Sequence, residues 1–142
     1  MVAGQILDME SENHKVNIET LERIHALKTG ELLKFAVTAG AYLGDATEEQ
    51  ISYLQDFAYY LGLIFQVQDD ILDVIGDEEK LGKAVGSDVS NNKSTYPSLL
   101  GIDGAMEMKK RYTDRAKELL MKANADTSRL IELTDYFSER DH

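Results

Sequence analysis

The sequence contains no cysteine, no tryptophan and only one proline in 142 residues. Without cysteine, the chain can form neither a disulfide nor a thiolate metal site. Histidine is also scarce, and the spacing of His14, His25 and His142 matches no zinc-binding motif. A single proline, combined with apolar residues at helical rather than alternating spacing, favours an all-α fold.

Basic residues are few: 15 lysines and arginines stand against 26 aspartates and glutamates, which gives a formal net charge of −11. A nucleic-acid-binding surface needs a basic patch, so this balance argues against a nucleic acid as partner. No run of about 18 uninterrupted apolar residues is present, and we therefore expect no stable membrane insertion. The sequence also lacks an opening secretion signal, so we expect a cytoplasmic protein.

The chain can bury one core, since 43% of its residues are hydrophobic and its length fits one domain. Apolar spacing predicts helices over residues 1–10, 18–25, 32–43, 47–75, 98–100, 104–123 and 128–138. The glycine- and charge-rich segment 76–88 is predicted to be a loop, and Lys28-Thr29-Gly30 a break between two helices. Together these elements predict a helical bundle.

The helix predicted over residues 47–75 is the longest of the chain. Thr47 and Gln50 have the spacing of a capping box at its start. Its apolar residues lie nearly all round the helix, which is typical of a helix buried in the middle of a bundle. Carboxylates in its second half should therefore face the interior or a cavity.

Three such carboxylates are Asp69, Asp70 and Asp73. Asp69 and Asp73 are four residues apart and share a helix face, where like charges cost about 0.2–0.5 kcal/mol. A cation between them would remove this penalty, and Mg²⁺ often links one or two carboxylates to substrate phosphates. We interpret the segment as a magnesium–diphosphate site, with Asp69 the more enclosed ligand because it lies one turn further from the predicted loop. A solvated acidic helix end is the alternative that this motif alone leaves open.

Three lysines, Lys28, Lys83 and Lys93, fall in predicted loops or breaks beside glycine, serine or threonine. Small residues let backbone N–H groups approach an anion, and an ammonium adds a compact positive charge. Any one of them alone could be an ordinary surface lysine. Three of them together with the acidic segment indicate a clamp for a diphosphate.

Several short motifs occur in one order along the chain: Gly4-Gln5 with Asp8, His25-x-x-Lys28-Thr29-Gly30, Phe65-Gln66-x-x-Asp69-Asp70-x-x-Asp73 with Gly76-Asp77, Gly82-Lys83-x-x-Gly86-Ser87-Asp88, and Asn92-Lys93-Ser94-Thr95-Tyr96-Pro97. Their order and gaps resemble the C-terminal half of the trans-isoprenyl diphosphate synthases, the family of farnesyl and geranylgeranyl diphosphate synthases. The resemblance extends over essentially the whole chain, so we expect residues 1–142 to form the C-terminal part of one such domain.

The resemblance implies an all-α bundle around a central cavity, usually as a homodimer. It implies a prenyltransferase that joins an allylic diphosphate to isopentenyl diphosphate with Mg²⁺ as cofactor. Ionisation of the allylic C–O bond would release diphosphate and leave a carbocation, which a dry apolar cavity protects from water.

The site residues follow from the motifs that match the family. The resemblance implies metal-binding roles for Asp69, Asp70 and Asp73, catalytic roles for Lys28, Thr29 and Gln66, and diphosphate-binding roles for Lys28, Gln66, Lys83 and Lys93. Lys93 would belong to a loop that closes the site.

Members of the family have a first aspartate-rich motif that is followed by two arginines. This sequence departs from that pattern, because it has only one aspartate-rich motif and no Arg-Arg pair. It also opens inside a predicted helix. We therefore expect a truncated portion that is inactive alone and exposes apolar surface. One alternative is a non-catalytic or regulatory subunit that keeps the fold. Another is a calcium-binding module, but residues 73–79 do not match the ligand register of an EF-hand loop.

Overall fold

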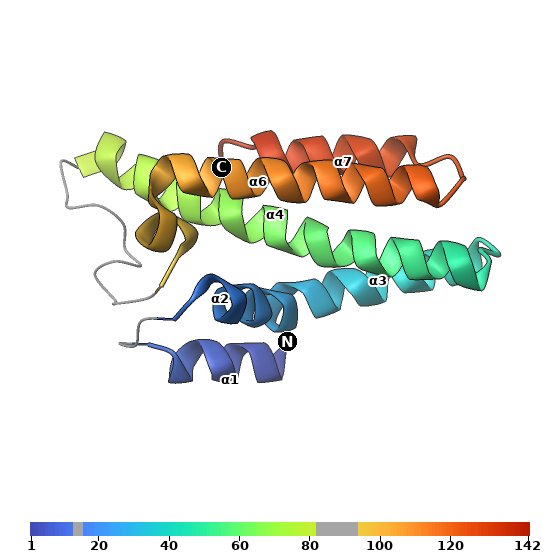
Figure 1. Ribbon diagram of the computed structural model, residues 1–142, viewed down its shortest axis with the longest axis horizontal. Coiled ribbons are helices and arrows are strands. Elements are labelled where there is room, and N and C mark those ends of the chain that lie inside the picture. The colour runs from blue at the N-terminus through green and yellow to red at the C-terminus, as the bar shows by residue number, and fades with distance from the viewer. Residues whose placement is uncertain (13–15, 82–93) are drawn as a thin grey trace.

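The computed structural model describes residues 1–12, 16–81 and 94–142, and for residues 77–81 it describes the backbone alone. Its helices are α1 (Val2–Glu10), α2 (Ile18–His25), the π-helical turn η1 (Ala26–Gly30), α3 (Glu31–Leu43), α4 (Glu48–Leu81), α6 (Tyr96–Lys122) and α7 (Ser128–Glu139). Within the described ranges no strand occurs, and the prediction of an all-α bundle is confirmed (Figure 1).

Helix α4 is the central element of the bundle. Helices α6 and α7 pack on one side of it, and α2, η1 and α3 pack on the other, with α1 outside them (Figure 1). Most of the buried hydrophobic core comes from α4 and α6: Phe57, Leu61, Leu63, Ile64, Val67, Ile71, Tyr96, Ala105, Tyr112, Ala116, Leu119 and Leu120. Burying each large apolar side chain contributes about 1.5–3 kcal/mol, so this layer supplies most of the driving force for folding. The predicted central position of this helix is confirmed.

The start of α4 has the predicted capping box. The Gln50 N–H donates to Thr47 Oγ1 at 3.1 Å, and the Thr47 N–H donates to Gln50 Oε1 at 3.0 Å. The two bonds satisfy backbone donors that the first turn of a helix leaves without partners.

The predicted loop over residues 76–88 is wrong in its first part, because α4 continues through Gly76 to Leu81. A glycine inside a helix costs about 1 kcal/mol relative to alanine. The residues at 78–81 are two glutamates, a lysine and a leucine, which are good helix formers and offset that cost. Residues 82–88 lie outside the described residues.

The predicted break at Lys28-Thr29-Gly30 is a continuous helical path with one wide turn. In η1 the Glu31 N–H donates to the carbonyl of Ala26, five residues earlier, so the turn contains one more residue than an α-helix allows. A Cβ on Gly62 of α4 would lie 3.0 Å from the Cα of Gly30. Glycine at position 62 therefore lets the wide turn pack closely on α4.

Helix α6 begins earlier than predicted and merges two predicted elements. Thr95 caps it by accepting the Ser98 N–H at 3.2 Å, and Pro97 lies in the first turn. The turn expected at residues 101–104 is a kink at Gly101, whose φ of 76° and ψ of 169° are not helical. A positive φ favours glycine, so the kink is encoded at this residue.

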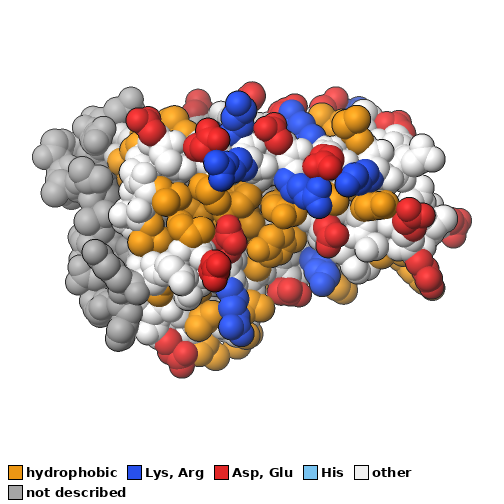
Figure 2. Space-filling model, in the orientation of Figure 1, with side chains coloured by type: hydrophobic (Ala, Val, Ile, Leu, Met, Phe, Trp, Pro, Cys, Tyr) orange, Lys and Arg blue, Asp and Glu red, His pale blue; other side chains and the backbone are white. Residues whose placement is uncertain are grey.

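Helix α3 buries no residue completely and leaves an apolar face exposed, with Phe35 72%, Tyr42 75% and Leu43 83% exposed. A Cβ built on Gly40 would meet no described atom within 4 Å. A second apolar patch lies on the face drawn in Figure 2, where hydrophobic side chains gather over the middle of α4 with charged side chains around them. Exposed apolar surface of this kind marks places where another polypeptide or ligand binds. Among the described helices, none has the length and apolar character to cross a bilayer.

Gly4 provides the first testable prediction, because a Cβ at this position would overlap the backbone of Leu27 and Lys28. We expect Gly4→Ala to lower the free energy of unfolding by about 1–3 kcal/mol, the usual cost of overpacking. It should also speed amide exchange in α1. The matched control is Gly40→Ala, which should raise stability by about 0.5–1 kcal/mol because its helix is open there. Urea denaturation measures both, and an equal gain in the two variants would contradict the close contact.

Candidate active site

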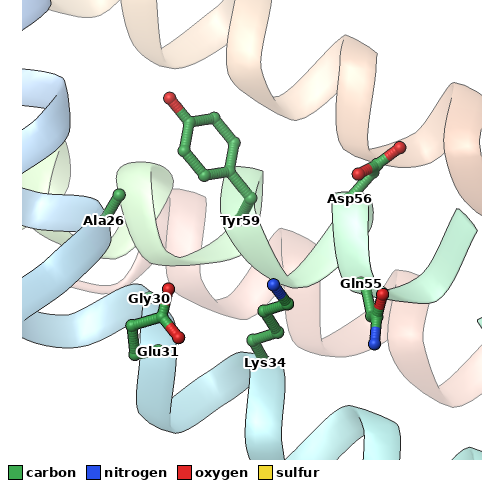
Figure 3. Close-up of a pocket in the computed structure, with 7 residues that line it drawn as sticks. All are labelled: Ala26, Gly30, Glu31, Lys34, Gln55, Asp56 and Tyr59. Atoms are coloured by element: carbon green, nitrogen blue, oxygen red, sulfur yellow. The ribbon is translucent and has the colours of Figure 1, made fainter. Parts of the chain in front are cut away.

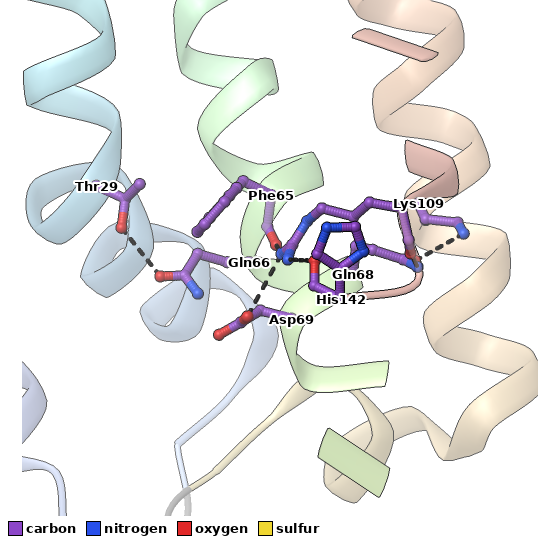
Figure 4. Close-up of polar contacts among 8 residues, drawn as sticks. Thr29, Phe65, Gln66, Gln68, Asp69, Lys109 and His142 are labelled. Atoms are coloured by element: carbon purple, nitrogen blue, oxygen red, sulfur yellow. Dashed lines mark hydrogen bonds and ion pairs between the residues drawn. The ribbon is translucent and has the colours of Figure 1, made fainter. Parts of the chain in front are cut away.

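Thr29 and Gln66 meet across the contact between η1 and α4. The Thr29 hydroxyl donates to Gln66 Oε1 at 2.9 Å (Figure 4). Because the wide turn of η1 packs on α4, it places Thr29 within reach of a side chain 37 residues away. Gln66 is buried, so the bond fixes the direction of its amide group. The structure thus brings together two of the predicted catalytic residues.

Lys28, the third predicted catalytic residue, is held by α1. Its ammonium lies 2.9 Å from Asp8 Oδ2, and both side chains are partly shielded from solvent. Asp8 was part of a motif in the sequence, but residue type and spacing alone gave it no role. The ion pair explains why α1 matters to the site: it supplies the carboxylate that orients Lys28.

A cavity of about 130 Å³ joins these groups to the acidic segment. It is lined by Asp8, His25, Lys28, Gln66, Asp69, Asp70, Ser94 and Thr95. Four predicted site residues therefore face one space, with charges of both signs. Thr29 does not line the cavity, but it is hydrogen-bonded to Gln66, which does. Lys83 and Lys93, both predicted to bind diphosphate, lie outside the described residues.

The carboxylates differ from the expectation in one respect. Asp69 was expected to be the more enclosed ligand, and this is wrong: its side chain is 57% exposed, whereas Asp73 is half-buried. The buried member is Asp70, which accepts the backbone N–H of Tyr96 at 3.2 Å. Successive helical residues point about 100° apart, so Asp70 faces the start of α6 while Asp69 faces the cavity rim.

The oxygen donors of the site suit a Mg²⁺ ion that takes only some of its ligands from the protein. In the part of the chain that the structure describes, no three acidic, histidine or cysteine side chains are grouped closely enough to hold a metal ion. Mg²⁺ does not require such a cage, since it usually keeps waters and binds one or two carboxylates together with substrate phosphates. Asp69 and Asp70 on a polar cavity beside Lys28 fit an ion that is shared with a phosphate.

Arg140 is a residue of this region that sequence reasoning did not single out. Its side chain is 8% exposed, and one terminal nitrogen lies 3.3 Å from Asp69 Oδ1 and donates to the Phe65 carbonyl at 3.1 Å. The guanidinium also lies 4.3 Å from the centre of the Phe65 ring, a cation–π contact. Arg140 therefore supplies a positive charge beside a predicted metal ligand.

The chain around Arg140 is anchored by a partly buried polar network. Gln68 Nε2 donates to the Arg140 carbonyl at 2.6 Å, and Lys109 Nζ donates to Gln68 Oε1 at 2.9 Å (Figure 4). Lys109 Nζ also donates to the Ser138 carbonyl at 2.8 Å. Helices α4 and α6 thereby fix the residues that follow α7 against the site. The only sequence signal for Arg140 was its place at the end of the family resemblance.

His25 is a second residue without a predicted role. Its ring is 7% exposed and stacks on Tyr96, with ring centres 5.7 Å apart and an interplanar angle of 19°. Neither ring nitrogen has a hydrogen-bond partner in the described part of the chain. Burial lowers the pKa of His25 to about 4, with Lys28 adding to the decrease and Asp8 opposing it. The imidazole is therefore neutral at pH 7.

A separate cavity of about 160 Å³ lies between η1, α3 and α4 (Figure 3). Its wall consists of Ala26, Gly30, Glu31, Lys34, Gln55, Asp56 and Tyr59. None of the predicted site residues lines it. The cavity next to the acidic segment is therefore the candidate active site.

The model of the polyprenyl synthetase family matches residues 1–136 of the chain. The chain belongs to the polyprenyl synthetase family. This confirms the family that the motifs indicated, and the cavity described above contains residues from several of those motifs.

The most similar curated relatives include the farnesyl diphosphate synthase of Bacillus subtilis, which is 50% identical over 142 residues, all of this chain and 48% of that protein. The farnesyl diphosphate synthase of Escherichia coli is 44% identical over 144 residues, which cover 99% of this chain and 48% of that protein. The chain therefore spans about half the length of the curated relatives it matches.

Solved structures agree with the fold. A geranyltransferase from Helicobacter pylori, in complex with magnesium and isoprenyl diphosphate, matches with a TM-score of 0.76 and 33% identity over 96% of this chain and 45% of that one. Heptaprenyl diphosphate synthase from Staphylococcus aureus matches with a TM-score of 0.87 over 99% of this chain and 56% of that one. At 24% identity, the second match supports the fold alone.

His25 predicts how stability depends on pH. Its pKa of about 4 in the folded chain lies below the ordinary value of 6.5, so the unfolded chain binds the proton more tightly. Stabilisation by the neutral ring is complete above pH 6.5 and is lost as pH falls towards 4. A shift of this size corresponds to about 3 kcal/mol.

Urea denaturation between pH 7 and pH 4 tests this prediction. The parent should lose more stability over this range than His25→Phe, which has the same acidic residues but no imidazole. Parallel losses in the two proteins would show that the low pKa of His25 does not contribute.

Proposed function

We propose that this chain forms the diphosphate-binding part of a magnesium-dependent trans-prenyltransferase, which condenses an allylic diphosphate with isopentenyl diphosphate. The proposal is supported by one observation above all: Lys28, Gln66, Asp69 and Asp70 border a single cavity in a member of the polyprenyl synthetase family. The relatives named above as farnesyl diphosphate synthases make the same reaction class the natural assignment. Farnesyl or geranylgeranyl diphosphate is the proposed product.

The first step is departure of the diphosphate from the allylic carbon, with the electron pair of the C–O bond leaving on oxygen. Mg²⁺, when bound, neutralises the negative charge that develops on the leaving diphosphate. Asp69 and Asp70, which line the cavity, would hold the ion from the protein side, and Asp73, one turn after Asp69 on the same helix face, is proposed to assist. Lys28 provides a fixed positive charge on the cavity wall, and Lys83 and Lys93 are proposed to add to it.

The remaining positive charge is on the allylic group, and the Thr29–Gln66 pair is suited to face it. Because the Thr29 hydroxyl donates a hydrogen bond to Gln66 Oε1, the hydroxyl oxygen keeps lone pairs that can stabilise a nearby cation. The same bond directs the donor nitrogen of the Gln66 amide away from Thr29. One residue pair can thus serve opposite ends of the ionising C–O bond, with the hydroxyl oxygen near carbon and the amide near diphosphate.

Residues 1–142 carry only part of the proposed site. They contain a single aspartate-rich motif, and the chain spans 48% of the Bacillus subtilis relative. The exposed apolar face of α3 gives a surface on which the equivalent of the remaining half can pack. We propose that this half, on the same or another polypeptide, completes the isopentenyl diphosphate site, and that the complete protein acts as a homodimer.

A second candidate function is a non-catalytic subunit that binds diphosphate without turning it over. It is favoured by the contact between Asp69 and Arg140, which already gives that carboxylate a positive partner. The two candidates predict different turnover once the half that this chain does not span is supplied.

Binding is tested by thermal melting with Mg²⁺ and inorganic pyrophosphate. The two together should raise the melting temperature of the parent more than either alone. Asp69→Asn and Asp73→Asn should each abolish most of this gain. Without ligand, both should melt within a few degrees of the parent, because each removes like-charge repulsion, which for Asp69→Asn offsets the lost contact with Arg140. Asp114→Asn, an equal charge change on the exposed face of α6, should keep the full gain. Variants that melt several degrees lower without ligand would show that these carboxylates are structural.

Activity is tested by complementation. The purified 142-residue chain should show no turnover of geranyl diphosphate with isopentenyl diphosphate. Co-expression with the half of the Bacillus subtilis synthase that this chain does not span should restore turnover if the chain is a catalytic part. Pyrophosphate binding without any restored turnover would instead support the non-catalytic subunit.

A further inference from the structure

Asp70 is the buried carboxylate of the acidic segment, and only 6% of its surface is exposed. The backbone N–H of Tyr96, a fully buried residue, donates to Asp70 Oδ2 at 3.2 Å. The two residues are 26 positions apart, so the contact joins the later half of α4 to the first turn of α6 (Figure 1). Metal binding alone does not account for this contact.

The first turn of α6 needs an acceptor from outside the helix. The first backbone N–H groups of any helix have no partner within it. Thr95 and Ser98 serve each other, because the Thr95 N–H donates to Ser98 Oγ at 2.7 Å and the Ser98 N–H donates to Thr95 Oγ1 at 3.2 Å. Pro97 has no N–H. The N–H of Tyr96 is the donor that this turn does not satisfy itself, and Asp70 supplies its acceptor.

The charge of Asp70 strengthens the contact. The N-terminus of a helix carries a partial positive charge, so a carboxylate beside it is stabilised. A hydrogen bond to an ionised acceptor is also roughly twice as strong as one between neutral groups. Without an acceptor at this position, the Tyr96 N–H would be buried and unpaired, which is rare in native structures. Asp70 therefore fixes the place where α6 begins.

The chain that leads into this turn forms part of the cavity wall. Ser94 and Thr95, the two residues before α6, line the same cavity as Lys28 and Asp69. The segment before α2 makes a second contact with this wall, because the Val16 N–H donates to Ser94 Oγ at 3.3 Å across 78 positions of the sequence. Two long-range contacts thus position the wall, and one of them comes from the acidic segment.

The position of this wall matters because the cavity is small, with a volume of about 130 Å³. Groups that bind a ligand must be held to within about 0.5 Å by the residues that support them. A shift of the first turn of α6 would move Ser94 and Thr95 relative to Lys28 and Asp69. The space for an anion and its metal ion would change with it.

We propose that Asp70 is a positioning residue for diphosphate binding: its carboxylate holds the first turn of α6 and thereby fixes the wall that Ser94 and Thr95 form. The inference rests on the proposed function, because it assumes that this cavity takes a metal-bound diphosphate. The hydrogen bond to Tyr96 contributes separately from any contact between Asp70 and the ion, and a neutral acceptor can replace it.

Two substitutions separate the charge of Asp70 from its hydrogen bond. Asp70→Asn and Asp70→Ala both remove the charge, but only asparagine keeps an oxygen that can accept the Tyr96 N–H. Calorimetry on the full chain with Mg²⁺ and inorganic pyrophosphate should show an affinity about 10-fold lower for Asp70→Ala than for Asp70→Asn. Amide exchange of Tyr96 should be slow in the parent and in Asp70→Asn, and at least about 10-fold faster in Asp70→Ala.

Ser98 allows the same wall to be loosened without a change in charge. It is exposed, it does not line the cavity, and its hydroxyl oxygen accepts the Thr95 N–H. Ser98→Ala should lower the affinity for pyrophosphate with Mg²⁺ by about 3- to 5-fold, since it removes half of the capping box. The matched control is Ser128→Ala, an exposed serine in the first turn of α7 that bonds to Asp126, and it should bind like the parent.

The outcomes separate the two levels of inference. Weaker binding by Asp70→Ala than by Asp70→Asn, together with weaker binding by Ser98→Ala, supports the positioning role. If the parent binds but the two Asp70 variants bind alike, or Ser98→Ala binds like the parent, that role is overturned and the proposed function stands. If Asp70→Ala does not fold, Ser98→Ala decides alone. If the parent itself does not bind pyrophosphate with Mg²⁺, the proposed function is overturned and the role of Asp70 with it.

Discussion

The burial of α4 between two layers of helices is the constraint on which the rest of the structure depends. Leu61 and Leu63 point to nearly opposite sides of α4, since successive helical residues are about 100° apart, and both can be buried only if other helices cover more than one side of α4. Polar side chains on the same helix, such as Gln66 and Asp70, are then carried into the interior with them. Each must find a partner there, because a buried polar group without one is costly. Apolar packing thus dictates where the polar site can form, and the site in turn ties together α1, η1, α6 and the residues after α7.

Much of this arrangement could be predicted from the sequence because it depends on local patterns. The capping box at Thr47 and the apolar circumference of the central helix are each encoded in a few neighbouring residues. The wide turn at Ala26–Gly30 could not be read as a helix, since a π-turn disturbs the 3.6-residue period by which helices are recognised. The continuation of α4 past Gly76 was missed because one glycine was weighed above the helix formers that follow it.

The errors in the site have a different origin, because they depend on contacts between residues far apart in the chain. Spacing correctly indicated that Asp69 and Asp73 share a helix face, but it carried no information about the neighbour of each carboxylate. Asp70 is buried because α6 begins against it, and Asp69 is exposed at the rim beside Arg140, a partner 71 residues away. His25 and Asp8 stood in recognised motifs, yet their surroundings become visible only when α1 and α2 are placed against α4.

These long-range contacts also suggest how a strongly acidic chain keeps a site for an anion. Two described cations near the acidic segment are each paired with a carboxylate, Lys28 with Asp8 and Arg140 with Asp69. Lys28 and Asp69 are themselves partly open to solvent, so these two side chains can change partner at modest cost, whereas the Arg140 guanidinium is nearly buried. Under the proposed function, a diphosphate that arrives with Mg²⁺ offers Lys28 an anion and Asp69 a cation at the same time. The exchange gives Lys28 and Asp69 new partners and releases Asp8 and Arg140 from theirs, whereas Mg²⁺ or diphosphate alone would engage only one of the two pairs. Under the proposed function, joint binding of metal and diphosphate is therefore the mode that this pairing of charges favours.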